Sequence, residues 1–137
     1  LNGEDSESLA LSLLYLIGSH YQKNLPAWEA DGIAKQLGVA PHLVDDMLDF
    51  LEALNYIVRT GESSTKIYPA RPVDKILIGQ VLRQLREQGI KRAGLQPTES
   101  DVKGEKAVVH LLSDLRQLID ERFGKKTLKD IIDASHT

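Results

Sequence analysis

Cysteine, aromatic residues and long apolar runs are all scarce in this sequence. Cysteine is absent altogether, which excludes disulfides, thiolate metal ligands, cysteine nucleophiles and cysteine-ligated iron–sulphur clusters. One Trp, two Phe and four Tyr are too few to suggest a surface on which nucleic-acid bases stack. The longest mainly apolar run, Leu9–Ile17, is about half of the ~20 residues that a membrane-spanning helix needs. It also lacks the basic segment that precedes the apolar part of a signal peptide.

Motifs for catalysis and for binding metals or cofactors are missing as well. No two histidines stand four residues apart on a predicted helix, and no HExxH, Walker, Rossmann or G-x-S-x-G motif occurs. The segment Asp45–Asp49, DDMLD, resembles the aspartate-rich motif that binds magnesium diphosphate in isoprenoid enzymes, and carboxylates one turn apart can hold hard cations. Those enzymes are longer and have a second acidic motif, so a solvated acidic face is the better interpretation. We predict no catalytic residue, no metal and no cofactor.

The composition is that of a folded domain. The chain has 137 residues, of which 42% are hydrophobic and 27% charged, and this is enough for one domain with a core. The net charge of −3 gives no general attraction to nucleic acid. Because the first residue is Leu and not Met, we expect a fragment or a processed form of a longer chain.

The stretch between residues 28 and 68 organises the chain. The predicted elements are a helix, a turn, a second helix and two strands, at Trp28–Leu37, Gly38–Pro41, Pro41–Leu54, Tyr56–Arg59 and Thr65–Tyr68. Gly38 can adopt the left-handed conformation that ends a helix, and Pro41 suits the first position of the next one. Two helices joined by so short a turn cross sharply. The order predicts a winged helix-turn-helix.

The second of these helices has an acidic side. Its apolar residues recur at helical spacing on one face, and the opposite face holds His42, Asp45, Asp46, Asp49 and Glu52. In a DNA-binding winged helix this face enters the major groove, where Arg, Lys, Asn or Gln contact bases and basic groups contact phosphates. Four carboxylates repel a duplex, and the wing offers only Arg59 and Lys66 in compensation. The sequence disfavours DNA and indicates a protein partner for this interaction face.

Further helices are predicted on both sides of this stretch. They cover about 6–21, 74–88 and 105–123, and a short terminal helix follows the capping box Thr127-Leu128-Lys129-Asp130. Residues 90–104 contain Gly and Pro among charged residues and predict a linker. The mostly α fold with a small β hairpin is thus divided into a winged helix-turn-helix domain at 1–89, a linker at 90–104 and a helical extension at 105–137. The apolar stripe of 105–123 serves either core packing or a homodimer.

Basic residues gather between residues 71 and 92. We consider four of them as contacts for phosphates or an acidic partner: Arg83, Arg86, Lys91 and Arg92. Anionic lipid headgroups would suit the same charges. A solvated helix face is the simpler interpretation.

Three segments resemble the IscR-like family of winged-helix transcription repressors: LALSLLYLIG, IAKQLGVAPHLVDDMLDFLEALNYIVRTG and YPARPVDKILIGQVL. The Ala-Arg-Pro step that leads from the wing into the next helix is the most distinctive of them, and the terminal TLKDIID is also similar. The resemblance implies a repressor that contacts DNA phosphates through Arg59, Lys66 and other basic residues. The chain departs from this family by lacking a basic N-terminal segment, a glycine-rich wing and cluster-binding cysteines.

The span Leu9–Ile132 is also similar to the cytoplasmic C-terminal winged-helix segment of BrkB/YihY-type inner-membrane proteins, historically called ribonuclease BN. This resemblance implies a non-catalytic regulatory or protein-interaction module at the cytoplasmic side of the inner membrane. Its partner would be another protein or its own membrane domain, and any RNA processing would need an active site outside this chain. A non-catalytic module of such a membrane protein is our leading hypothesis. An IscR-like DNA-binding repressor without an iron–sulphur cluster is the alternative.

Overall fold

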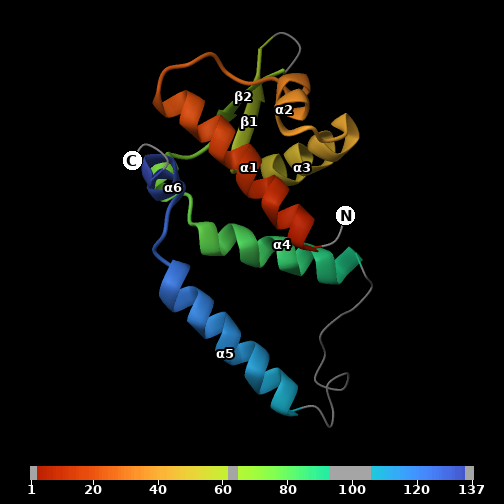
Figure 1. The fold of residues 1–137 in the computed structure, drawn as a ribbon, viewed down its shortest axis with the longest axis vertical. Helices are drawn as coiled ribbons and strands as arrows, with labels where there is room; N and C mark the ends of the chain where they lie inside the picture. Colours follow the sequence, from red (N-terminus) through yellow and green to blue (C-terminus); the bar gives the residue numbers. More distant parts are fainter. Residues whose placement is uncertain (1–2, 62–64, 93–105, 135–137) are drawn as a thin grey trace. The chain divides into compact units, whose positions relative to one another are not determined.

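The computed structural model describes residues 3–61, 65–92 and 106–134 (Figure 1). The helices are α1 (Gly3–Gln22), α2 (Ala30–Leu37), α3 (Pro41–Ala53), the 3₁₀ helix η1 (Val73–Lys75), α4 (Ile78–Arg92), α5 (Lys106–Phe123) and α6 (Leu128–Ala134). Strands β1 (Ile57–Thr60) and β2 (Lys66–Pro69) form an antiparallel hairpin, in which Arg59 pairs with Ile67. The prediction of a mostly α fold with a small β hairpin is confirmed.

The chain forms two compact units. The first comprises Leu1–Ile76 and Thr127–Thr137, and the second comprises Leu77–Lys126. The terminal helix α6 therefore belongs to the unit that holds the wing, whereas we expected it in a separate extension at 105–137. The linker expected at 90–104 lies outside the described residues, apart from 90–92, which are part of α4. The division at 1–89, 90–104 and 105–137 stays a prediction.

The turn between α2 and α3 forms as the sequence predicts. Gly38 has φ 65°, in the left-handed region, and the following N–H, of Val39, donates to the Ala34 carbonyl over 3.1 Å. Pro41 occupies the first turn of α3, and Ala40 before it provides no side-chain cap. Helix α3 is therefore held mainly by its buried side, which consists of Val44, Met47, Leu48 and Leu51.

The predicted start of α2 was wrong by two residues. The helix begins at Ala30, whereas Trp28 forms an antiparallel β-bridge with Ile67. The Ile67 N–H donates to the Trp28 carbonyl over 3.0 Å. This bridge ties the segment before α2 to the hairpin and places the wing beside the helix-turn-helix.

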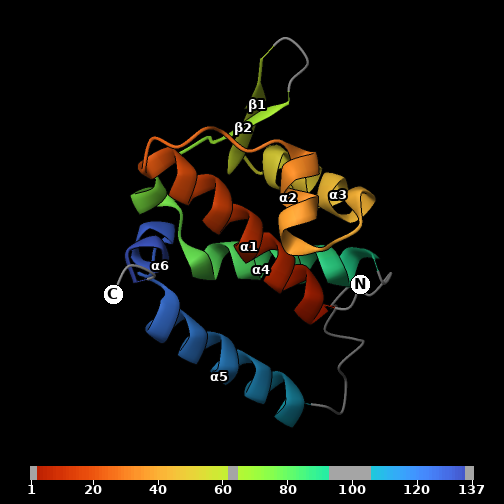
Figure 2. The ribbon, with the colours of Figure 1, turned by 45° about the horizontal axis from the view of Figure 1, so that its top comes forward.

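Helix α1 contacts α3, β2 and α6 within the first unit, and the hairpin extends beyond these helices (Figure 2). The buried apolar residues of α1 are Leu9, Ala10, Leu13, Leu14 and Ile17. Gly18 faces α6, because a Cβ built on it would lie 3.0 Å from Leu128 Cδ2 and 3.1 Å from Ile132 Cδ1. The missing side chain lets the two helices approach closely.

The predicted capping box opens α6. The Thr127 N–H donates to Asp130 Oδ2 over 2.9 Å, and the Asp130 N–H donates to Thr127 Oγ1 over 3.2 Å. This reciprocal pair satisfies two N–H groups that the first helical turn leaves without partners. The Leu128 N–H donates to the Ile76 carbonyl over 2.9 Å, which joins the start of α6 to the segment after η1.

In the second unit, α4 and α5 contact each other. Helix α4 begins at Ile78 and not near residue 74, because residues 73–75 form η1. The Ile78 N–H donates to the Lys126 carbonyl over 3.0 Å. Three leucines of α5 are well exposed, namely Leu111, Leu115 and Leu118. None of the helices in the described ranges has both the length and the apolar character that crossing a membrane requires.

Candidate nucleic-acid interface

The outer side of α3 is acidic and open to solvent. His42, Asp45 and Asp46 are exposed, and the side chains of Asp49 and Glu52 are 68% and 38% exposed. They project from the helix opposite its buried apolar residues, as the spacing predicts. Asp45 and Asp46 make no ion pair with another described residue.

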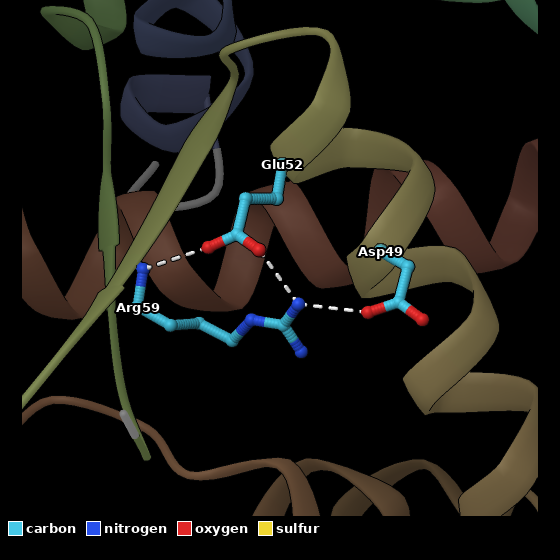
Figure 3. A network of polar contacts seen from close by, with 3 residues as sticks. All are labelled: Asp49, Glu52 and Arg59. Carbon is cyan, nitrogen blue, oxygen red and sulfur yellow. Dashed lines mark hydrogen bonds and ion pairs between the residues drawn. The ribbon is translucent and has the colours of Figure 1, made fainter. Parts of the chain in front are cut away.

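Arg59 on β1 reaches across to this acidic side (Figure 3). Its Nη2 donates to Asp49 Oδ1 and to Glu52 Oε1, each over 2.7 Å. Its backbone N–H donates to the second oxygen of Glu52, Oε2, over 3.3 Å. Asp49 and Glu52 are three residues apart on α3 and therefore neighbours on one face. We call these three residues the Arg59 clamp.

The clamp shifts the pKa values of Glu52 and Arg59. The hydrogen bond from Arg59 lowers the pKa of Glu52 below its ordinary value of 4.5, although partial burial and the nearby Asp49 charge act in the opposite direction. The two carboxylates raise the pKa of Arg59. Each shift favours the charged form of the group, because an opposite charge within hydrogen-bonding distance stabilises it. Glu52 and Arg59 are therefore both charged at neutral pH.

The other basic residue of the wing is also partnered. Lys66 Nζ lies 3.6 Å from Glu29 Oε1, and both side chains are about half exposed. On the α3 side, four carboxylates against the single Arg59 guanidinium leave three net negative charges. Neither Arg59 nor Lys66 therefore offers an unpaired charge to a phosphate in this structure.

Arg71 is a structural residue whose role the sequence interpretation did not identify. Its Nε donates to the Asn55 carbonyl over 3.0 Å and its Nη2 to the Leu54 carbonyl over 2.8 Å. Both carbonyls follow the last turn of α3, where a positive charge is favourable. The distinctive Ala-Arg-Pro step was the signal that could have indicated such a position.

The basic residues of α4 belong to the second unit. Arg83 and Arg86 are exposed, whereas Lys91 and Arg92 are helical but their side chains lie outside the described set. None of these four basic residues belongs to the unit that contains α3. Among the described residues no group of three His, Asp or Glu side chains could hold a metal ion.

No protein-family model and no curated protein matches this sequence. Solved structures do resemble it. CymR of Staphylococcus aureus has 15% sequence identity and a TM-score of 0.70, covering 93% of this chain and 95% of that one. CymR (YrzC), the global cysteine regulator of B. subtilis, has 16% identity and a TM-score of 0.68, with 96% and 95% covered. IscR of T. potens has 14% identity and a TM-score of 0.68, with 95% and 85% covered.

At such low identity these likenesses establish the winged-helix fold and nothing finer. They support the IscR-like part of the sequence interpretation. They give no support to the leading hypothesis of a BrkB/YihY-type membrane-protein tail, and the alternative of an IscR-like regulator fits them better.

Proposed function

We propose that this protein is a DNA-binding transcription regulator of the winged-helix class that works without an iron–sulphur cluster. The observation that carries the proposal is the extent of the structural likeness. The similar structures named above are regulators, and the likeness to CymR of S. aureus spans 93% of this chain, beyond the helix-turn-helix itself. The absence of cysteine from the sequence is the reason for leaving out the cluster.

The acidic side of α3 restricts how such a protein would bind. A carboxylate can accept a hydrogen bond from the N4 amino group of cytosine in the major groove, so Asp45 and Asp46 suit base contacts better than phosphate contacts. Phosphate contacts must come from elsewhere. Lys35 on α2 is exposed and makes no ion pair with another described residue, and the first helix of a helix-turn-helix crosses the DNA backbone.

We also propose that the regulator is a homodimer assembled through α5. The exposed Leu111, Leu115 and Leu118 recur at i, i+4 and i+7 and so form one apolar stripe. A second copy could cover this stripe with the same stripe, as the twofold symmetry of most dimers requires. Such a dimer would carry two winged helices, one for each half-site of a twofold-symmetric DNA site.

A second candidate function is that of a protein-interaction module. It is favoured by the three net negative charges on α3 and the clamp, because they repel a duplex and would attract a basic protein surface. No helix among the described residues could span a membrane, and a membrane domain as the partner has no support from the comparisons.

Selection of duplexes from a random pool, followed by titration of salt, tests the main proposal. A regulator should enrich a defined sequence, and its log affinity should fall by about 0.9 per phosphate contact for each unit of log salt. Lys35→Glu should make this slope less steep by about 0.9, the value of one phosphate contact. The control Lys125→Glu makes the same charge change in the second unit and should change the slope less. Absence of any enrichment at low salt would leave the protein-interaction function as the better one.

A further inference from the structure

We propose that the Arg59 clamp is an autoinhibitory contact, in which Asp49 and Glu52 of the recognition helix keep the wing arginine away from DNA phosphates. This inference rests on the proposed DNA-binding function and adds a means of regulation to it. It concerns the contact between α3 and β1, and both elements belong to the first unit.

The geometry shows why the clamp competes with a phosphate. Arg59 uses one nitrogen, Nη2, for both carboxylates, at 2.7 Å each, and a charge-assisted hydrogen bond of this length is among the stronger kinds. A guanidinium binds phosphates as well as carboxylates. Asp49 and Glu52 therefore compete with a DNA phosphate for the Arg59 guanidinium and already neutralise its charge.

The backbone contributes to the same contact. Because the Arg59 N–H also donates to Glu52 Oε2, Glu52 holds both the main chain and the side chain of this residue. Only 23% of the Arg59 side chain is exposed, compared with 49% for Lys66. The clamp thus neutralises a side chain that is mostly buried, whereas Lys66, 3.6 Å from Glu29, is about half exposed.

Removing the clamp should restore one phosphate contact. A guanidinium that reaches a phosphate adds about 0.9 to the slope of log affinity against log salt. At an ionic strength of about 50 mM, one such contact corresponds to roughly a tenfold gain in affinity. Loss of two negative charges from α3 also weakens repulsion, so the test has to separate these two effects.

The matched pair of variants is Asp49→Asn/Glu52→Gln and Asp45→Asn/Asp46→Asn. Both remove two negative charges from the same face of α3, and only the first releases Arg59. The probe is a duplex of unrelated sequence, so that base contacts of Asp45 and Asp46 do not enter the comparison. We expect the first variant to bind a duplex about tenfold more tightly than the second at low salt, with the salt slope steeper by about 0.9. Adding Arg59→Gln to both double variants should abolish this difference in affinity and slope. Arg59→Gln alone leaves the charges of Asp49 and Glu52 uncompensated, so it should weaken binding and not strengthen it.

Two results would overturn the inference while leaving the proposed function intact. One is equal affinity and slope for the two double variants when both bind DNA. The other is a thermal-unfolding cycle of Glu52→Gln and Arg59→Gln, without DNA, in which the two changes are simply additive, because the clamp would then not hold in solution. If the unmodified chain and all variants fail to bind any duplex, the proposed function itself fails and the autoinhibitory role is overturned with it.

Discussion

Arg71 lies over the ring of Tyr56, with its guanidinium carbon 4.5 Å from the ring centroid. Tyr56 is fully buried, and the same guanidinium donates to the carbonyls of Leu54 and Asn55. Asn55 has φ 64°, so the chain reverses here in a left-handed conformation that Asn tolerates. Arg71 thus fastens the end of α3 to the start of the wing.

Arg71→Lys should destabilise the protein. A lysine ammonium cannot serve both carbonyls in the planar arrangement of a guanidinium, nor stack on the ring in the same way. We expect a loss of about 1–2 kcal/mol in the free energy of unfolding, measured by urea denaturation. The control is Arg83→Lys on an exposed part of α4, which should change stability by less than about 0.5 kcal/mol. Equal effects of the two changes would show that the contacts of Arg71 contribute nothing specific.

Glu52 should make the stability depend on pH in acid. Its folded pKa lies below the unfolded value of 4.5, so the unfolded chain binds the proton first and stability falls as the pH falls. The contribution is fully present above 4.5 and is lost as the pH passes the folded pKa. Because Glu52 is partly exposed, we expect less than about 1 kcal/mol, measured as the difference between the unmodified chain and Glu52→Gln at pH 7 and in acid.

The control for this pH dependence is the same comparison in an Arg59→Gln background. Without the guanidinium, the main cause of the lowered pKa is gone. The stability difference that Glu52→Gln produces in this background should therefore no longer change with pH in the same window. A difference that persists unchanged would assign the effect to another group.

Gly18 and Gly32 should respond differently to alanine. A Cβ at Gly18 would meet three side chains at 3.0–3.2 Å, whereas a Cβ at Gly32 would meet only the Trp28 ring at 3.4 Å or more. Both glycines are helical, so alanine brings a gain of up to about 1 kcal/mol in helix propensity. Gly32→Ala should realise this gain, and Gly18→Ala should be less stable than Gly32→Ala by about 1 kcal/mol or more because of overpacking. Thermal unfolding of both variants measures this difference in stability. Equal stabilisation by the two changes would contradict the overpacking at Gly18.

Leu111→Glu/Leu118→Glu should convert the expected dimer to a monomer, because it puts two charges into the apolar stripe of α5. The control Ser113→Glu/Gln117→Glu adds the same charge at exposed positions on the other side of the helix. Light scattering gives the molecular mass of the unmodified chain and of each variant in solution. Identical masses for the unmodified chain and both variants would contradict the α5 dimer. Point changes are preferable to a chain ending at Gly104, since that truncation also removes α6 from α1.

Local signals in the sequence were sufficient for much of the fold. Gly38 and Pro41 specify the turn between two helices by their own backbone preferences, and the Thr127–Asp130 box specifies the start of α6. Both were predicted correctly, because each depends on residues within four positions of one another.

Elements that depend on distant partners were not predictable in this way. The local pattern assigns Trp28 to a helix, but its carbonyl accepts a hydrogen bond from Ile67, and this pairing prevails over helix propensity. The predicted start of α4, near residue 74, is too early. The helix begins at Ile78, whose backbone N–H donates a hydrogen bond to the distant Lys126 carbonyl. The sequence also identified Arg59 and the carboxylates of α3 separately, but not that they bind each other, since the contact needs the wing to fold back on α3.

The hydrogen bond between Gln22 and Asp133 joins residues 111 positions apart, and it has a consequence for biosynthesis. The first unit takes its opening helix and its closing helix from far-separated parts of the chain. During translation the surface of α1 around Gly18 therefore emerges long before α6 exists to cover it. Such late pairing leaves apolar surface of α1 uncovered until residues 127–134 have been made, and transiently exposed apolar surface favours aggregation.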